Sequence, residues 1–288
     1  MAKGHPTRSR RPARGSTPRR AVGFVGSGNM ATALIRGLLA RGRYRPKEVW
    51  ASDVDPKKLA LLRRRFKVGT TDDNSALVRG SQVVVIAVKP QIIDVVLAQM
   101  RPGVTPKKLF ISIAAGVTTA RLQAGLGAGA RLLRVMPNTP ALLGRGMSVL
   151  VRGRSATPAD ERLGLRLLRA VGQAVAVRDE RLLDAVTGLS GSGPAYVYVF
   201  AAGLILGGAA AGLPPPLARQ LALQTLTGAA AMLQETGKSP QQLCAMVTSP
   251  GGTTRAGLDE LERWRFRDAV AAAVVRATRR SEELARGR

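Results

Sequence analysis

The sequence predicts an α/β domain followed by an all-α domain. From residue 21 onward, short apolar runs alternate with stretches of helical periodicity, which is the pattern of a parallel β-sheet with helices on both faces. After Ser190-Gly191-Ser192-Gly193-Pro194 the composition is helical to the end of the chain. With 288 residues, of which 45% are hydrophobic and 3% aromatic, the chain can bury a sizeable core built from Ala, Leu and Val.

The first twenty residues differ from the rest of the chain. They are rich in Pro, Gly, Ser and Arg, carry seven basic residues and no acid, and offer no apolar side chains to bury. This composition predicts a disordered basic tail over residues 1–20. The tail has neither the apolar core of a secretory signal nor the amphipathic apolar face of a transit peptide.

The formal charge of +27 would ordinarily suggest a nucleic-acid partner. Beyond the tail, however, the basic residues are scattered, and no aromatic side chains are interleaved with them for base stacking. We therefore expect no specific nucleic-acid function. A single cysteine, Cys244, excludes an intrachain disulfide and indicates a reducing compartment, which predicts a cytoplasmic protein.

The first strand is predicted at residues 21–26, and a helical run over residues 30–42 follows it closely. The segment between them, Gly26-Ser27-Gly28-Asn29-Met30-Ala31, is G-x-G-x-x-A, which in this context is the fingerprint of a dinucleotide-binding loop. Gly26 permits the tight turn, Gly28 lets the backbone approach a pyrophosphate, and the small Ala31 lets the helix pack on the strand. The N–H groups of the helix start would face the phosphates.

The second strand is predicted in Glu48-Val49-Trp50-Ala51-Ser52-Asp53 and ends at Asp53. An acid at this place accepts hydrogen bonds from the adenosine ribose and repels a 2′-phosphate, which favours NAD. Lys57 and Lys58 follow closely enough to neutralise that charge. The choice between NADH and NADPH therefore stays open.

Three further strands are expected in the apolar runs at residues 81–90, 108–116 and 131–140. Continuous apolar runs are typical of parallel strands that are buried on both faces. A helix should then begin after Thr157, an N-cap residue followed by Pro158 in the first turn. Another strand and the start of a new helix are expected between residues 174 and 189.

The helical part is interrupted at Pro214-Pro215-Pro216, near Pro240 and at residues 247–254. Residues 185–218 carry no charge, and their apolar part is long enough to span a bilayer. The Gly- and Pro-rich entry and the Gly/Ala-rich centre favour a different structure, a central helix packed against others across a subunit interface. We therefore expect no membrane association.

The segment Val247-Thr248-Ser249-Pro250-Gly251-Gly252-Thr253-Thr254 precedes a helical run that is expected to begin near Ala256. Backbone N–H groups around Gly252 to Thr254 at a helix start form an anion site suited to a carboxylate, although an ordinary N-cap has the same residue types. The one histidine, His5, lies in the tail, so no catalytic histidine is expected. The sequence contains no His/Cys/carboxylate cluster that would predict a metal site.

Four stretches, in this order and spacing, resemble the pyrroline-5-carboxylate reductase family. They are VGFVGSGNM, AVKPQ, RVMPNTP, and DAVTGLSGSGPAY together with VTSPGGTT, and the resemblance covers about residues 21–284. It implies an NAD(P)-binding Rossmann domain over residues 21–178 and a helical dimerisation and substrate domain over residues 179–288. The implied activity is reduction of 1-pyrroline-5-carboxylate to L-proline with NADPH or NADH, the last step of proline biosynthesis. The implied assembly is a homodimer or a higher homo-oligomer such as a decamer, in which two subunits complete each active site.

The resemblance also assigns roles to residues that match the family's motifs. The implied cofactor-binding residues are Gly26, Ser27, Gly28, Asn29, Met30, Asp53, Asn74, Ala87, Val88, Lys89, Pro90 and Ala115. The implied substrate-binding residues are Glu180, Ser249, Gly252, Thr253 and Thr254. Thr254 is also the catalytic candidate, because its hydroxyl would reach the ring nitrogen of the substrate.

The chain departs from the family pattern at two places. Ala202 and Leu206 stand where a Glu and an Asp are usual, and Cys244-Ala245-Met246 replaces charged or polar residues, with Met246 at a position close to the cofactor. These departures leave two alternatives open. The first alternative is a nucleotide-binding paralogue with weakened catalysis, and the second is a reductase of a related small imine or oxo acid.

Overall fold

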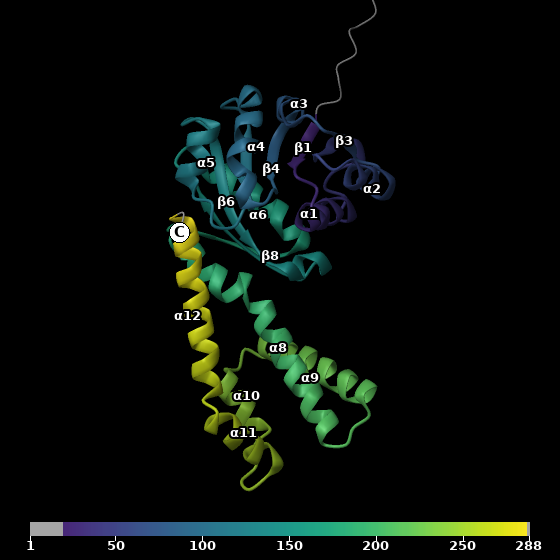
Figure 1. Ribbon diagram of the computed structural model, residues 1–288, viewed down its shortest axis with the longest axis vertical. Helices are drawn as coiled ribbons and strands as arrows, with labels where there is room; N and C mark the ends of the chain where they lie inside the picture. Colours follow the sequence, from purple (N-terminus) through teal and green to yellow (C-terminus); the bar gives the residue numbers. More distant parts are fainter. Residues whose placement is uncertain (1–19, 287–288) are drawn as a thin grey trace, which may run out of the picture.

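The computed structural model describes residues 20–286, which form a Rossmann-like α/β domain and an elongated helical region below it (Figure 1). The predicted tail at residues 1–20 lies outside the described residues except for Arg20, which opens the first strand. The two parts follow each other along the chain, as the change in composition after the SGSGP segment predicted. The fold class is thereby confirmed.

The α/β domain is built on one eight-stranded sheet of order β3-β2-β1-β4-β5-β6-β7-β8. The first strand of the chain leads into the glycine-rich loop. Strand order reverses between β1 and β4. The strands are β1 (Arg20–Val25), β2 (Val49–Ser52), β3 (Gly69–Thr71), β4 (Ser81–Ile86), β5 (Leu109–Ser112), β6 (Arg131–Pro137), β7 (Gly146–Arg152) and β8 (Gly172–Val177).

The last two strands of the sheet run against the other six. We expected a parallel sheet, and β1 to β6 pair in parallel, but β7 pairs antiparallel with β6, and β8 pairs in parallel with β7. The connection from β6 to β7, residues 138–145, contains only one short 3₁₀ turn. A parallel strand needs a crossover of a dozen or more residues, so this short connection turns the chain back on itself.

Alternate side chains of the central strands fill two separate cores, one on each face of the sheet. On β4, Val83 and Val85 belong to one core, whereas Val84 and Ile86 belong to the other. The first core is covered by α1, α2 and α6, and the second by α3, α4 and α5. The period-two split explains why these strands are apolar on both faces.

The α/β helices connect the strands, and the one N-cap predicted for them is present. Thr157 caps α6, where its side chain accepts a hydrogen bond from the N–H of Asp160. The helices are α1 (Asn29–Ala40), α2 (Pro56–Phe66), α3 (Asn74–Gly80), α4 (Ile93–Met100), α5 (Thr119–Leu126) and α6 (Pro158–Leu168), with 3₁₀ turns at Pro46–Glu48, Pro90–Ile92, Arg101–Gly103, Thr139–Leu143 and Arg169–Val171.

The helical region begins after β8 and turns at the predicted breaks. Its helices are α7 (Leu182–Val186), a π-helical turn (Thr187–Gly191), α8 (Gly193–Ala210), α9 (Pro215–Glu235), α10 (Pro240–Met246), α11 (Thr253–Arg263) and α12 (Phe266–Ala285). α11 begins at Thr253 rather than near Ala256, because the chain becomes helical directly after the N-cap Gly252.

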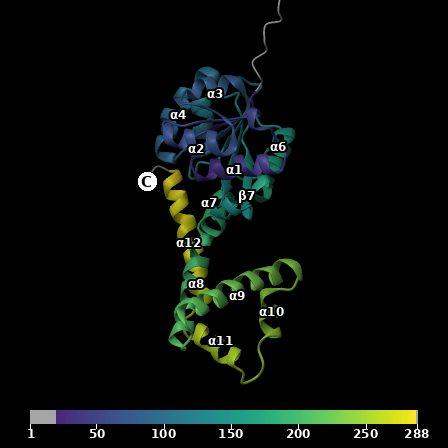
Figure 2. The ribbon, with the colours of Figure 1, turned by 90° about the vertical axis from the view of Figure 1, so that its right-hand side faces the viewer.

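The long α12 returns the chain to the α/β domain, beside α7 and the π-helical turn (Figures 1 and 2). Gly188 makes this approach possible, since a Cβ atom there would lie 2.3 Å from Thr278 Oγ1 and 2.6 Å from the carbonyl oxygen of Val274. Ser281 Oγ donates to Asp184 Oδ1 at 2.7 Å and ties α12 to α7. The π-helical turn lies in the middle of the DAVTGLSGSGPAY signature, and such turns are frequent at functional sites.

Candidate functional site

The glycine-rich loop closely approaches the segment that follows β4. Gly26 has φ +93°, and a Cβ atom there would lie 2.7 Å from the carbonyl oxygen of Ala87 and 2.9 Å from Val88 Cγ1. Glycine is therefore required at this position for both conformation and space. At Gly28, by contrast, a Cβ atom would meet nothing within 4 Å, so the backbone faces open space.

The helix that follows this loop leaves its first N–H groups without a capping side chain. α1 has Gly28 as its N-cap and no side-chain cap hydrogen bond, whereas Asp55 and Asp73 cap α2 and α3. Asn29 and Met30 form the first turn of α1. Unpaired N–H groups and the positive end of the helix dipole favour an anion here, as a dinucleotide pyrophosphate requires.

Asp53, directly after β2, holds the glycine-rich loop. Its Oδ2 accepts hydrogen bonds from the N–H of Ser27 at 2.8 Å and from Ser27 Oγ at 2.7 Å, and its Oδ1 accepts from the N–H of Asp55 at 3.0 Å. Partial burial acts to raise the pKa of Asp53, but the hydrogen bonds from Ser27 and Asp55 outweigh it and hold the pKa below its ordinary value. Asp53 is thus ionised at neutral pH, in contact with the loop.

Asn74 begins α3 beside the end of β2. Its Oδ1 accepts from Ser52 Oγ at 2.6 Å, and its Nδ2 donates to Gln99 Oε1 at 2.7 Å. The side chain therefore connects the ends of three elements, β2, α3 and α4. Ser52 and Gln99 are contacts that the sequence did not indicate.

The remaining cofactor candidates follow the carboxyl ends of β4 and β5. Residues 87–90 come directly after β4, and Ala115 lies between β5 and α5. The N–H of Ala87 donates to the carbonyl oxygen of Val25 at 2.8 Å, and the N–H of Ile113 donates to that of Ile86 at 3.0 Å. The ends of β1, β2, β4 and β5 thus meet at one edge, beside the reversal of strand order where α/β sheets bind ligands.

Glu180 lies where the chain leaves the sheet for the helical region. Its Oε1 accepts from the N–H of Thr119 at 2.7 Å and from Arg134 Nη1 at 2.6 Å, and its Oε2 accepts from Thr119 Oγ1 at 2.5 Å. Burial acts to raise the pKa of Glu180, but the hydrogen bonds from Thr119 and Arg134 prevail and lower it. Sequence reasoning missed Arg134 and Thr119, because nothing in their local segments marks them.

A second contact joins the RVMPNTP and DAVTGLSGSGPAY segments, where the α/β domain meets the helical region. Asn138, in the MPNTP segment, donates from Nδ2 to Ser190 Oγ at 3.2 Å and to the Ser190 carbonyl oxygen at 3.3 Å. Its Oδ1 accepts from the N–H of Met147 at 2.8 Å. The amide of Asn138 therefore connects β7, the β6–β7 connection and the π-helical turn.

The turn between α10 and α11 resembles the start of α1. Gly252 is the N-cap of α11 and provides no side-chain cap, and Gly251 before it has φ +69°. A Cβ atom at Gly252 would lie 2.3 Å from Ser249 Oγ, so glycine is needed for the turn to close on Ser249. The first N–H groups of α11 are thus open to an anion.

Three hydroxyl groups of this turn are also unused by the rest of the described chain. Within residues 20–286 the structure shows no hydrogen bond from the hydroxyls of Ser249, Thr253 or Thr254. Other threonines in or next to the helices donate to the carbonyl oxygen four residues earlier; these are Thr187, Thr227, Thr236 and Thr278, and, within the turn itself, Thr248. The turn therefore offers hydroxyl as well as amide donors.

The turn and the sheet edge lie at opposite ends of the molecule. Figures 1 and 2 both place α10 and α11 at the end of the helical region that is farthest from the sheet. The structure brings the cofactor candidates together in one crevice, with Glu180 at the domain junction. It does not bring Ser249, Gly252, Thr253 and Thr254 to that crevice within one chain.

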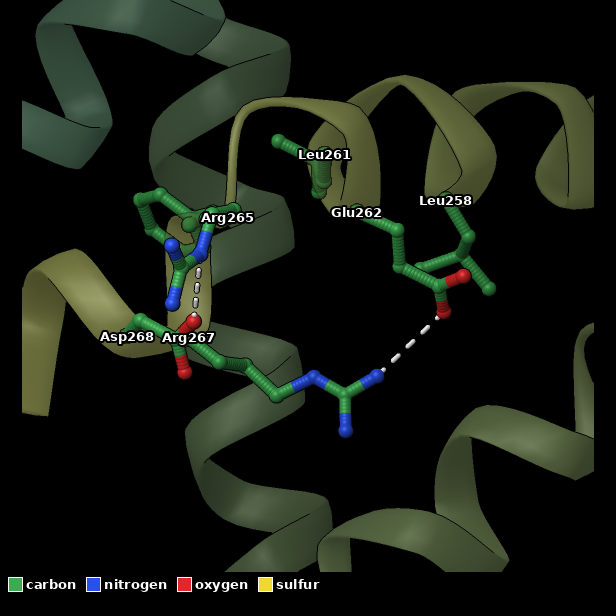
Figure 3. Close-up of a pocket in the computed structure, with 7 residues that line it drawn as sticks. Leu258, Leu261, Glu262, Arg265, Arg267 and Asp268 are labelled. Carbon is green, nitrogen blue, oxygen red and sulfur yellow. Dashed lines mark hydrogen bonds and ion pairs between the residues drawn. The ribbon is translucent and has the colours of Figure 1, made fainter.

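A hollow of about 400 Å³ lies near this distant end, at the turn from α11 to α12 (Figure 3). Its charged side chains pair with one another: Arg265 Nε lies 2.9 Å from Asp268 Oδ2, and Arg267 Nη2 lies 3.3 Å from Glu262 Oε1. The hollow is therefore lined by ion pairs of the helical region and contains none of the predicted site residues.

The departures from the family pattern lie on exposed surfaces of the helical region. Leu206 on α8 is 69% exposed, and Met246 at the end of α10 is 58% exposed, with its Sδ 3.2 Å from Lys238 Nζ. The segment Leu182–Ala210 is long and apolar enough to cross a membrane, by length and composition alone. Within the described residues, no group of three or more His, Cys, Asp or Glu side chains is arranged to hold a metal ion.

Comparisons with known proteins agree with this division. Residues 180–284 match the family model described as pyrroline-5-carboxylate reductase dimerisation, and residues 21–116 match the one described as NADP oxidoreductase, coenzyme F420-dependent. The chain is 42% identical over 263 residues to a pyrroline-5-carboxylate reductase of Methanosarcina acetivorans, which covers 91% of this chain and 97% of the relative. It is 44% identical over 267 residues to that of Glycine max, with 91% and 95% covered.

Solved structures show the same similarity. A pyrroline-5-carboxylate reductase of Coxiella burnetii superposes with a TM-score of 0.86 at 35% identity and covers 92% of this chain and 98% of its own. The pyrroline carboxylate reductase of Plasmodium falciparum, solved with NADP bound, superposes with a TM-score of 0.84 at 30% identity, with 94% and 100% covered.

Proposed function

The chain belongs to the pyrroline-5-carboxylate reductase family, and on that premise we propose that it reduces 1-pyrroline-5-carboxylate to L-proline with NADPH or NADH. This is the last step of proline biosynthesis. The observation that carries the proposal is a pair of open helix starts in one chain. α1 and α11 are the two described helices whose N-cap is glycine, and neither has a side-chain cap. One suits a pyrophosphate and the other a carboxylate.

The residues of the crevice fit a nicotinamide dinucleotide. Gly28 leaves room for the backbone to approach the pyrophosphate. Asp53 follows β2 and is ionised, so its carboxylate would accept hydrogen bonds from the ribose hydroxyls. The ends of β4 and β5, with Ala87, Val88 and Ala115, would line the nicotinamide side of the crevice. When bound, the reduced nicotinamide supplies a hydride.

The turn at the start of α11 would orient the substrate. The N–H groups of Thr253 and Thr254, together with Ser249 Oγ, would bind the carboxylate and fix the ring, while Thr254 Oγ1 would lie against the ring nitrogen. The imine carbon gains the hydride and the nitrogen gains a proton, which yields the secondary amine of proline. A cyclic imine that arrives protonated needs no strong acid from the protein, so positioning is the main task of these residues.

The separation of crevice and turn supports an active site shared between two subunits. The family match to the dimerisation region covers α7 to α12, the same helices that expose apolar side chains. In the proposed dimer the turn of one subunit faces the crevice of its partner, and α8 lies in the interface rather than in a membrane. A decamer built from such dimers and a cytoplasmic location belong to the same proposal, as does a domain boundary between residues 178 and 179.

The test is steady-state oxidation of NADPH and of NADH by the full-length protein with 1-pyrroline-5-carboxylate. We expect substrate-dependent oxidation and L-proline as the product. Absence of turnover with both cofactors, in protein that binds them by calorimetry, would instead indicate a paralogue with weakened catalysis, for which Ala202, Leu206 and Met246 are the motivation. Turnover with another small imine or oxo acid but not with this substrate would indicate a related reductase.

A further inference from the structure

We propose that Glu180 is a positioning residue, which holds the loop of residues 113–118 in place for the nicotinamide and joins it to the start of the helical region. The proposal rests on the proposed function, because that function gives the loop its ligand. It assigns Glu180 a role that acts through Thr119 and Arg134, in addition to its predicted place near the substrate.

The first argument is the number of elements that meet at one carboxylate. Glu180 lies between β8 and α7, Thr119 is the first residue of α5, and Arg134 lies in β6. The carboxylate accepts the first N–H of α5 at 2.7 Å and the Thr119 hydroxyl at 2.5 Å, while Thr118 caps the N–H of Arg121 at 3.3 Å. Glu180 therefore satisfies a donor at the helix start that Thr118 does not reach.

The second argument is the length of chain between fixed points. The loop is held at one end by the Ile113 N–H, which donates to the Ile86 carbonyl oxygen at 3.0 Å, and at the other end by Glu180 through Thr119. Ala115 lies between these two points. A shift of Thr119 would therefore move Ala115, and displacements of about 1 Å in a site have large effects on rate.

The third argument is burial. The Arg134 side chain is 5% exposed and lies on the sheet face covered by α5, since Leu132, two residues earlier, belongs to that core. Its guanidinium lies 2.6 Å from Glu180 Oε1. Loss of one partner of a buried pair leaves a buried charge uncompensated, so the pair strongly favours a single arrangement of the junction.

The other side of the loop is closed by the end of α12. A Cβ atom added at Gly116 would lie 3.8 Å from Leu284 Cβ, and α12 is tied to α7 through Ser281 and Asp184. α7 begins two residues after Glu180. Glu180, through Thr119, and the end of α12 thus both lie next to this loop, and both belong to the helical region.

The experiment compares Glu180→Ala, Glu180→Gln and Thr119→Val with Asp94→Ala. Asp94 is the matched control, because it forms an ion pair with Arg121 of the same helix, also at 2.6 Å, but at the exposed surface. The readouts are the Kd of NADPH and NADH by nicotinamide fluorescence and hydrogen exchange of residues 113–119 in the full-length protein. KM and kcat for 1-pyrroline-5-carboxylate are measured in parallel.

We expect Glu180→Ala to raise the cofactor Kd about tenfold and to speed exchange in the loop. Glu180→Gln should recover part of the loss, because one oxygen still accepts from Thr119. Thr119→Val should raise Kd by about two- to threefold, and combined with Glu180→Ala it should add little, as expected for groups acting through one contact. Asp94→Ala should leave all values unchanged.

The opposite pattern would overturn the proposal. It is wrong if Glu180→Ala changes only the KM for 1-pyrroline-5-carboxylate, with loop exchange and cofactor Kd unchanged, because Glu180 then acts on substrate alone. If Glu180→Ala does not fold, Thr119→Val keeps the ion pair and decides by the same readouts. If the wild-type protein lacks turnover, the Kd and exchange results still test the positioning role, and the proposed function alone fails.

Discussion

The two parts of this chain bury their apolar residues to very different degrees. In the α/β domain, two cores on the faces of the sheet enclose most side chains of the central strands β1, β4 and β5, among them Phe24 and Phe110. Between residues 187 and 286, the buried hydrophobic residues are three alanines, Ala201, Ala218 and Ala222. Large apolar side chains there are exposed instead, with Val199 on α8 at 74%.

This difference indicates which part is complete in a single subunit. A domain with a closed core is expected to fold alone. An exposed apolar surface of this extent marks an interaction site, and the match to a dimerisation region names the partner class as a second copy. We therefore expect dinucleotide binding by the α/β domain to survive substitutions that abolish dimerisation or carboxylate binding by the helical region.

The largest expected effect comes from a charge on α8. Val199→Glu should weaken the dimer by roughly 100-fold or more, because it places a carboxylate in an apolar interface. Turnover at low enzyme concentration should fall with the dimer, while the Kd of the dinucleotide changes little. Light scattering, activity and nicotinamide fluorescence measure the three quantities.

Val95→Glu provides the matched control, since Val95 on α4 is also exposed, at 64%, but lies in the α/β domain. It should leave assembly and activity unaltered. If Val199→Glu remained dimeric and fully active, the comparison between a complete and an incomplete half would be wrong.

A smaller effect is expected at the turn between α10 and α11, the proposed carboxylate site. Thr254→Ala should lower kcat/KM by roughly 10- to 100-fold through the loss of a hydrogen bond to a charged group. Dinucleotide affinity should stay unchanged, because the Thr254 hydroxyl is assigned to the substrate ring and not to the dinucleotide. Thr236→Ala is the control for loss of a threonine hydroxyl outside the turn, and unchanged kcat/KM in Thr254→Ala would exclude the assigned role.

The glycines of the dinucleotide loop allow a finer test within the complete half. Gly28→Ala should keep the melting temperature but raise the dinucleotide Kd by about tenfold, since its methyl group would occupy the pyrophosphate space. Gly26→Ala should also lower stability by ~1–2 kcal/mol or more, because of its positive φ and the contact with Ala87. Calorimetry and thermal melts separate the two, and equal melting temperatures for both variants would contradict this assignment.

The smallest expected effect depends on pH. The folded pKa of Glu180 lies below its ordinary value of 4.5, so its charge stabilises the folded state above that pH, and the contribution is lost as pH falls through the folded pKa. Glu180→Gln should therefore lower Tm by ~2–4 °C at pH 7, with the gap closing below about pH 4.5. The exposed Asp72→Asn should show no such gap, whereas a gap that widens in acid would contradict the sign.

Much of the fold could be predicted because its signals are local. The apolar run before Gly26, the N-cap Thr157 and the proline breaks each determine structure within a few residues. The orientation of β7 was not predictable in this way, since it follows from the absence of a crossover helix. β3, with three half-buried residues of which two are threonine, carries no apolar run that would reveal it.

The candidate site shows the same division. The glycine-rich loop and the turn at Gly252 were recognisable because close approach restricts which residues fit. The partners of Glu180 lie 61 and 46 positions away in the sequence, and Arg134 looks like any other arginine in an arginine-rich chain. Only the tertiary structure shows that it is buried and paired.

The position of Leu284 next to Gly116 has a consequence for how the protein is made. A ribosome completes the last strand at residue 177, yet Leu284, beside the loop of residues 113–118, is added more than 100 residues later. A nascent chain would thus have a complete sheet before Leu284 is present beside the loop. A premature stop codon shortly before residue 284 would therefore spare the sheet and the turn before α11 but remove Leu284 from beside this loop.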